Sequence, residues 1–280
     1  MVVLLGLTAA VLYGSGDFLG GMATRRAHVL TVLTLVESAG VIVALAAAVI
    51  SSDSASLAGL AWGLSAGLVG GFGLIVFYTG LAAGPMSVVA PVSGLVSTVL
   101  PVAVALGEGE RPGVGVYAGA LLCLVAIVLA SSAGDAGPAH PGRLGRAIAY
   151  GTASGASFGL FFLLIRNAGQ SGELWPVAAG RIGELAIILA AAAVLRPGLL
   201  RGVGGGIPLA AAGAGAIDVV ANICYVAATR TGAFGLAVVL ASLYPGVTVL
   251  LARVVLGERL RRIQRVGLAL AAVGIVLVAA

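Results

Sequence analysis

Long apolar stretches make up most of the chain, and short breaks with polar residues, glycine or proline separate them. A membrane-spanning helix needs about 20 mostly apolar residues. Ten stretches reach or approach that length: Val2–Met22, Val29–Ile50, Leu57–Leu81, Met86–Leu106, Gly113–Ala130, Ala147–Ile165, Trp175–Leu195, Ile207–Ala228, Ala233–Val255 and Val266–Ala280. The pattern therefore predicts an all-α polytopic membrane protein with ten transmembrane helices.

Turn-forming residues mark several of the breaks, and one longer connection divides the chain near its middle. Gly84-Pro85, Arg196-Pro197-Gly198 and Thr231-Gly232 each follow an apolar stretch, as the turn preferences of glycine and proline lead one to expect. The longest connection, Ser131–Arg146, is rich in glycine, proline and serine. We therefore expect a first five-helix repeat over residues 1–131, a linker over 132–146 and a second five-helix repeat over 147–280.

The two halves of the chain resemble each other. The aligned residues are Tyr13-Gly14 with Phe158-Gly159, Glu37 with Glu184, Tyr78 with Tyr225, and Gly109-Glu110-Arg111 with Gly257-Glu258-Arg259. Glu37 and Glu184 are 147 residues apart, as are the two tyrosines Tyr78 and Tyr225. Self-similarity at about half the chain length indicates a duplicated fold. Because each half holds an odd number of helices, the second half enters the membrane in the opposite orientation, which predicts inverted repeats.

The composition excludes a soluble protein. The chain is 60% hydrophobic and 9% charged, whereas soluble domains have about 25% charged residues. Aromatic residues make up only 5% of the chain, so helix contacts must rest on small residues, which suits close packing in lipid. Glycines recur every fourth residue in three places: Gly16 and Gly20; Gly63, Gly67 and Gly71; Gly151, Gly155 and Gly159. Tight packing alone would explain each of these ridges.

The net charge of +5 comes from arginine, since the sequence contains no lysine. No basic patch with interleaved aromatic residues is present, so no nucleic-acid partner is expected. Ten arginines lie in one set of alternate loops and three in the other, and the positive-inside rule then places both termini on the same, outer side. Cys123 and Cys224 lie in apolar stretches and His28 and His140 in loops, so we expect no metal or other cofactor.

Five ionisable residues lie at membrane depth in the predicted spans, and these are the first candidates for function. They are Asp17, Glu37, Arg181, Glu184 and Asp218. A charge at the centre of the bilayer costs at least about 2.5–3.5 kcal/mol and is a functional candidate by default. The four acids are candidates for proton coupling. Alternatively, Arg181 and Glu184 form an ion pair on one helix face, Arg181 extends to the membrane surface, or the two glutamates brace the repeats.

A polar stripe and two prolines add candidates for solute binding or translocation. Asp218, Asn222 and Tyr225 share one helix face, which either binds solute or holds helices together. Pro91 and Pro245 each remove a backbone hydrogen bond and can kink a helix, which would make neighbouring carbonyls and hydroxyls available to a ligand. The further candidates are Tyr13, Ser15, Tyr78, Ser93, Phe158, Ser242 and Tyr244.

The chain resembles the EamA-type branch of the drug/metabolite transporter superfamily over nearly its whole length. The resemblance rests on Tyr13-Gly14-Ser15-Gly16-Asp17-Phe18, on Ser242-Leu243-Tyr244-Pro245, and on Gly-Glu-Arg after the fourth and ninth predicted helices. Family members often have tryptophan at the place of Tyr13 and asparagine at that of Asp17. The resemblance implies a central cavity lined by helices one, three, four, six, eight and nine, peripheral helices five and ten, and cytoplasmic termini, which disagrees with the arginine count.

The sequence thus predicts a secondary active transporter rather than an enzyme, since no catalytic set of residues is visible. The resemblance implies export or exchange of small metabolites, amino acids or drug-like solutes across the plasma (inner) membrane. We expect alternating access, with one half moving against the other around a midplane site, and transport that can be coupled to protons. A membrane scaffold or partner subunit is the alternative, and the oligomeric state stays open.

Overall fold

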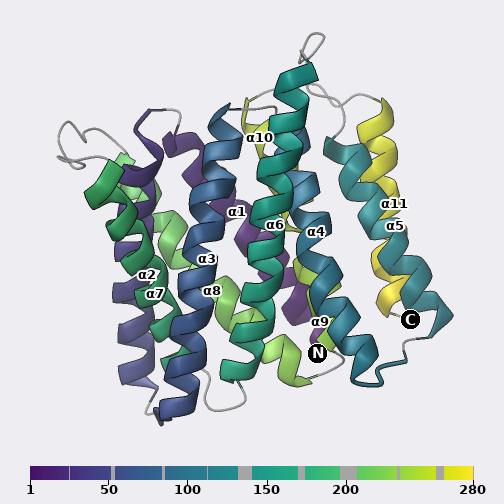
Figure 1. The fold of residues 1–280 in the computed structure, drawn as a ribbon. Helices are drawn as coiled ribbons and strands as arrows, with labels where there is room; N and C mark the ends of the chain where they lie inside the picture. The colour runs from purple at the N-terminus through teal and green to yellow at the C-terminus, as the bar shows by residue number, and fades with distance from the viewer. Residues whose placement is uncertain are drawn as a thin grey trace.

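The computed structural model describes residues 1–24, 26–51, 54–83, 86–111, 113–131, 141–169, 174–195, 207–231, 234–256 and 262–279, and within these ranges it is helical without any strand (Figure 1). The helices are α1 (Val2–Thr24), α2 (Val29–Ile50), α3 (Leu57–Ala83), α4 (Met86–Gly107), α5 (Val114–Ser131), α6 (Pro141–Gly169), α7 (Leu174–Leu195), α8 (Ile207–Thr231), α9 (Phe234–Ala241), α10 (Tyr244–Leu256) and α11 (Arg262–Ala279). The prediction of an all-α fold is confirmed. Among the described residues, seven helices are long and apolar enough to cross a membrane, so a total of ten spans stays a prediction.

The helix predicted over Ala233–Val255 is interrupted next to Pro245, where the sequence indicated a break. It consists of two helices, α9 and α10, with Ser242 and Leu243 in a turn between them. Pro245 has no N–H with which to continue the ladder of hydrogen bonds, and it lies in the first turn of α10, where that loss is tolerated. The last residues of the predicted linker 132–146 belong to α6, which begins at Pro141.

The predicted kink at Pro91 does not interrupt its helix, since α4 continues through that position. Three of the predicted turns, Gly84-Pro85, Arg196-Pro197-Gly198 and Gly232, and the repeated Gly257-Glu258-Arg259 lie outside the described residues, as does most of the linker.

Helices far apart in the sequence pack side by side. α3 packs against α6 and α7, α1 against α8, α2 against α7 and α8, and α4 against α6. α5 and α11 pack on each other at one edge of the bundle, and α1 begins at the same end of the bundle at which α11 ends (Figure 1). The outer faces of the helices are apolar, with large exposed side chains such as Ile42, Leu121 and Val194, as lipid contact requires.

Glycine ridges bring these helices into backbone contact. A Cβ atom on Gly63 would lie 2.2 Å from the Pro176 carbonyl oxygen, and one on Gly67 would lie 1.9 Å from that of Gly180, so α3 and α7 touch without side chains between them. Gly151 and Gly155 on α6 meet α4 in the same way. Small residues permit such close approach of helices in lipid, and here they fix the positions of the helices that carry the charged residues.

Candidate solute cavity

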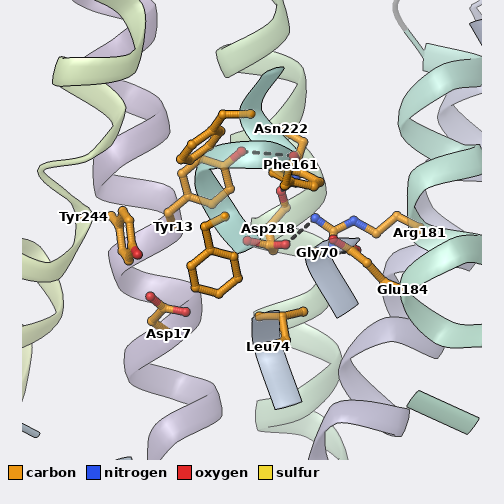
Figure 2. Close-up of a pocket in the computed structure, with 12 residues that line it drawn as sticks. Tyr13, Asp17, Gly70, Leu74, Phe161, Arg181, Glu184, Asp218, Asn222 and Tyr244 are labelled. Carbon is orange, nitrogen blue, oxygen red and sulfur yellow. Dashed lines mark hydrogen bonds and ion pairs between the residues drawn. The ribbon is translucent and has the colours of Figure 1, made fainter. Parts of the chain in front are cut away.

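A cavity with about 490 Å³ of empty volume lies between helices of both halves. Its wall is formed by residues from α1, α3, α6, α7, α8 and α10: Tyr13, Asp17, Gly70, Leu74, Phe158, Phe161, Phe162, Arg181, Glu184, Asp218, Asn222 and Tyr244 (Figure 2). Sites for small molecules in proteins have mostly apolar walls with a few polar groups, and the residues that line this cavity fit that description. The helices that contribute are close to those implied by the resemblance, with α7 in place of α4 among the residues that line it.

Aromatic side chains form much of the wall. The ring of Tyr13 stands edge-on to those of Phe162 and Tyr244, with centroids 6.3 Å and 6.2 Å away. The Tyr13 hydroxyl donates a hydrogen bond of 3.0 Å to Oδ1 of Asn222, which connects α1 to α8. Sequence analysis did not single out Phe161 or Phe162. An adjacent pair of phenylalanines in a chain with so few aromatic residues, next to the candidate Phe158, was the available indication.

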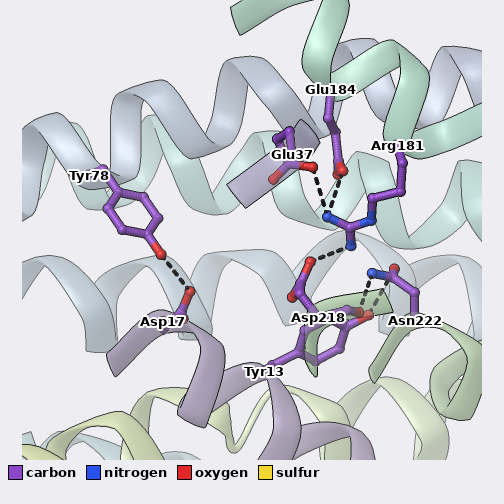
Figure 3. Close-up of polar contacts among 8 residues, drawn as sticks. All are labelled: Tyr13, Asp17, Glu37, Tyr78, Arg181, Glu184, Asp218 and Asn222. Atoms are coloured by element: carbon purple, nitrogen blue, oxygen red, sulfur yellow. Dashed lines mark hydrogen bonds and ion pairs between the residues drawn. The ribbon is translucent and has the colours of Figure 1, made fainter. Parts of the chain in front are cut away.

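One arginine holds three carboxyl groups in the interior (Figure 3). Nη1 of Arg181 donates to Oε2 of Glu37 at 2.9 Å and lies 2.9 Å from Oε2 of Glu184, and Nη2 donates to Oδ2 of Asp218. The Arg181 side chain is 2% exposed, those of Glu37 and Glu184 are 1% and 5% exposed, and that of Asp218 is 26% exposed. We call these four residues the Arg181 cluster. It connects α2, α7 and α8.

The predicted ion pair between Arg181 and Glu184 is present, whereas the prediction that Arg181 extends to the membrane surface is wrong. Its guanidinium has three acidic partners inside the bundle, so it has no need of lipid headgroups or water. Glycines make the cluster possible: Gly215 on α8 packs against the carbonyl of Val36 on α2, and Gly40 faces the Arg181 side chain. Glycine at these two positions lets the helices approach closely enough for the charged side chains to meet.

Asp17 forms a separate acidic position in the cavity wall. The Tyr78 hydroxyl from α3 donates a long hydrogen bond of 3.5 Å to its Oδ1, and the carboxyl group faces the same cavity as Tyr244 and Tyr13 (Figure 2). Its neighbour Gly16 on α1 faces Asp218, since a Cβ atom on Gly16 would lie 3.9 Å from the Asp218 Cβ on α8. Two acidic groups from α1 and α8 thus face one space.

The other candidates divide into two groups. Phe158, Asn222 and Tyr244 line the cavity with Tyr13, whereas Ser15 bonds to the carbonyl of Val11 in its own helix at 2.7 Å and is not part of the wall. Tyr225 lies behind the wall, where its hydroxyl donates to the Phe162 carbonyl at 3.3 Å. The predicted stripe of Asp218, Asn222 and Tyr225 therefore supplies two residues to the cavity and one to the contact with α6.

Three further candidates lie at the contact between α4 and the α9–α10 turn. Ser93 is fully buried and accepts a hydrogen bond of 3.0 Å from Ser154 on α6. Ser242 is also fully buried, with no hydrogen-bond partner for its hydroxyl in the described part of the chain. Pro245 packs against Gly94. The side chain of Pro91 lies outside the described residues. None of these residues lines the cavity.

A second set of charged residues, Glu108, Glu110 and Arg166, lies at one end of the bundle. In the sequence analysis Glu110 served only as evidence for the internal repeat. The Glu110 carboxylate caps α9 by accepting hydrogen bonds from the backbone N–H groups of Phe234 at 2.7 Å and Gly235 at 3.1 Å. A carboxylate is favourable there, because the first N–H groups of a helix lack partners within it. The aligned Glu258 lies outside the described residues.

Next to that cap, Arg166 at the end of α6 makes two contacts with Glu108, at 3.0 and 2.8 Å. The hydrogen bond from Arg166 holds the pKa of Glu108 below its ordinary value. The guanidinium also stands 4.0 Å above the ring of Phe234, in the geometry of a cation–π contact. The end of α6 is thereby attached to both the α4–α5 connection and the start of α9.

A helical bundle with apolar outer faces and ionisable groups around an internal cavity is the architecture of a polytopic membrane transport protein. Residues 145–280 match the EamA-like transporter family, so the second half of the chain is an EamA-like transporter domain. The resemblance to the drug/metabolite transporter superfamily is confirmed to this extent, and the family indicates a multi-pass membrane transporter.

A solved structure, described only as "Crystal structure of protein", has the same fold. It superposes with a TM-score of 0.80 at 20% sequence identity, and the match covers 99% of this chain and 95% of that one. At this identity the likeness shows the fold alone. No curated protein matches the sequence.

Proposed function

We propose that the protein is a secondary active transporter that moves a small solute across the plasma membrane by alternating access through the cavity between its halves. The observation that carries the proposal is the composition of the cavity wall, which combines aromatic residues with a buried arginine and its acids in helices long enough to cross a membrane. Ionisable residues at such depth are costly and mark transport pathways in membrane proteins.

Alternating access through such a site is common in transporters built from inverted repeats, and equivalent contacts in the two halves support that organisation. The Tyr78 hydroxyl bonds to Asp17, and the Tyr225 hydroxyl bonds to Phe162. The two tyrosines are 147 residues apart, and Asp17 and Phe162 are 145 apart, which is also the separation of the aligned Tyr13 and Phe158. A contact between the first and third helices of the same half thus occurs once in each half.

The packing of whole helices supports the same organisation. If the two halves are exchanged, the contact of α1 with α8 corresponds to that of α6 with α3, and both are observed. In the same way the contact of α4 with α6 corresponds to the contacts of α1 with α9 and α10, and these are observed as well. The contacts of α2 with α7 and of α5 with α11 relate each helix to its own equivalent. In Figure 1 α1 and α6 run in opposite directions through the bundle, as expected of repeats with ten spans in total.

The Arg181 cluster departs from the repeat, and this difference gives the cavity its charge. Glu37 and Glu184 are equivalent and contact the same nitrogen of Arg181. The residues equivalent to Arg181 and Asp218 at the same 147-residue separation are Thr34 and Gly71, which carry no charge. A symmetric pair of glutamates therefore holds an arginine that only the second half supplies.

Proton coupling is the finer part of the proposal. Glu37, Glu184 and Asp218 surround one guanidinium, and Asp17 adds a fourth carboxyl group in the wall of the same cavity. Four ionised carboxylates would leave a net charge of −3 in a nonpolar interior, so bound protons are the simplest way to lower that charge when no solute is present. Protonation and solute binding at the same acids would couple their movements.

Flux measurements in proteoliposomes test the proposal. Purified protein is assayed with a panel of metabolites, amino acids and drug-like compounds, with and without a proton gradient, beside the variants Asp17→Asn, Glu37→Gln, Glu184→Gln and Asp218→Asn. We expect at least one solute to move, and at least one variant to lose gradient-driven flux while it retains exchange. If all four variants keep full gradient-driven flux, proton coupling is wrong. If no compound moves under any gradient, the chain is better explained as a scaffold or partner subunit.

A further inference from the structure

The cavity holds more acidic groups than its arginine can balance. Arg181 faces Glu37, Glu184 and Asp218, and its two terminal nitrogens are both engaged by these carboxylates. Asp17 adds a fourth acid from α1, which accepts a long hydrogen bond from a tyrosine hydroxyl. Among the described residues that line the cavity, Arg181 is the one cationic side chain. An anionic solute would have to compete with these carboxylates for the Arg181 guanidinium.

The wall around these acids suits a positive charge. Five of the twelve lining residues are aromatic: Tyr13, Phe158, Phe161, Phe162 and Tyr244. A cation within about 6 Å of an aromatic face is stabilised by the negative potential of the ring, by up to about 2 kcal/mol when water is excluded. Acids alone also occur in proton pathways, and aromatic rings alone also occur in ordinary packing. The two together around one cavity form the arrangement that binds organic cations.

An unsatisfied hydroxyl marks the part of the cavity next to Asp17. The Tyr244 side chain is 5% exposed, and in the described part of the chain its hydroxyl makes no hydrogen bond of ordinary geometry, with the Ser93 hydroxyl as a nearby polar group. Figure 2 shows this hydroxyl on the cavity side of α10, turned toward Asp17. A buried hydroxyl without a partner costs about 1–3 kcal/mol. A ligand with an N–H group or another polar atom beside Asp17 would satisfy it.

From these observations we infer that the transported solute is an organic cation with an aromatic or apolar body, its positive charge held between Asp17 and Asp218 and its body against Tyr13, Tyr244 and the phenylalanines. This inference rests on the proposed transport function and assigns its substrate class. The Arg181 cluster then has a supporting part: it fixes the position of Asp218 on α8 and leaves Asp17 to meet the ligand.

Three probes of one size and different charge test the inference. Binding of phenyltrimethylammonium, phenylalanine and phenylacetate to the purified protein in detergent is measured by isothermal titration calorimetry. These probes are a cation, a zwitterion and an anion with the same ring. We expect the cation to bind at least about tenfold more tightly than the anion. Equal or tighter binding of phenylacetate or of phenylalanine overturns the inference, and so does the failure of the cation to bind at millimolar concentration.

A pair of variants locates the binding site. Asp17→Asn is the informative change, because Asp17 lies outside the Arg181 cluster and its loss leaves those ion pairs intact. It should weaken binding of phenyltrimethylammonium by about tenfold. Glu108→Gln removes the same charge at the end of the bundle, outside the cavity, and should leave the affinity unchanged. Equal effects of the two variants overturn the assignment of the site, because they would reflect the net charge of the whole protein.

Proteoliposome flux separates this inference from the proposed function. Uptake of the cationic probe above that of protein-free vesicles supports both. Uptake of the zwitterion or the anion without the cation overturns the substrate class and leaves transport standing. If no probe moves but the cation binds with the expected selectivity and dependence on Asp17, the cation site stands and the transport function fails.

Discussion

Arg166 and Arg181 make similar contacts in different surroundings. Arg166 makes two contacts of 3.0 and 2.8 Å with Glu108, and the two side chains are 19% and 48% exposed. Arg181 makes contacts of 2.9 Å with Glu37 and with Glu184, and its own side chain is 2% exposed. Contact geometry alone does not distinguish the two. The difference is that water can solvate the charges at Arg166 when its partner is absent, and cannot do so at Arg181.

This difference assigns the two sites different parts in the molecule. An exposed ion pair contributes about 0–1 kcal/mol, so the Arg166 contact can open and close at little cost. Loss of one partner from a buried ion pair leaves a charge without compensation and costs about 3–5 kcal/mol. The Arg181 cluster is therefore expected to stay intact and to hold α2, α7 and α8 together.

Removal of the buried guanidinium should have the largest effect. Arg181→Met keeps much of the side-chain length but leaves three carboxyl groups without a cation, so we expect a loss of about 3–5 kcal/mol in the free energy of unfolding. Unfolding in detergent, followed by circular dichroism, measures it. Arg166→Met is the matched control and should lose less than about 1 kcal/mol. Similar losses in the two variants would contradict the distinction between the sites.

A smaller effect is expected when the packing beside Arg181 is disturbed while every charge is kept. Gly67→Ala places a methyl group against the carbonyl oxygen of Gly180, so α3 and α7 must separate, at a cost of about 1–3 kcal/mol. Gly213→Ala is the matched control, since a Cβ there meets nothing within 4 Å, and alanine is favoured over glycine in a helix by about 0.5–1 kcal/mol. Thermal unfolding of both variants in detergent should show opposite shifts. If Gly67→Ala is as stable as wild type, close contact of α3 and α7 does not support the cluster.

The smallest effect is expected at Glu108, where it should depend on pH and salt. The pKa of Glu108 is lowered in the folded protein by its hydrogen bond to Arg166, so the pair stabilises the fold above the ordinary glutamate pKa of about 4.3 and loses this contribution as the pH falls through the lowered value. Glu108→Gln should therefore be less stable than wild type by no more than about 1 kcal/mol at pH 7 and low salt. The difference should disappear at high salt and in strong acid. A difference that persists in strong acid would show that the glutamine change acts through packing instead of charge.

The sequence predicted the parts of the structure that depend on neighbouring residues. An apolar stretch of sufficient length specifies a helix and its environment by itself, so the helices were located well, except for α9, α10 and the start of α6. Arg181 and Glu184 are three residues apart, and helical geometry alone places them together. The acids were recognised because a charge among apolar residues is costly wherever its helix packs.

Only the tertiary structure decided what each of these residues contacts. Glu37 and Arg181 are 144 residues apart and meet because Gly40 and Gly215 allow α2, α7 and α8 to approach. Asp17 meets Tyr78, Ser15 turns back to its own helix, and Tyr225 stands behind the wall formed by Phe162. A helix that is apolar on every side does not reveal which face its neighbours cover. Its rotation is set by close packing against other helices, and this packing placed Asp17, Glu184 and Asp218 in the cavity wall and Glu37 outside it, paired with Arg181.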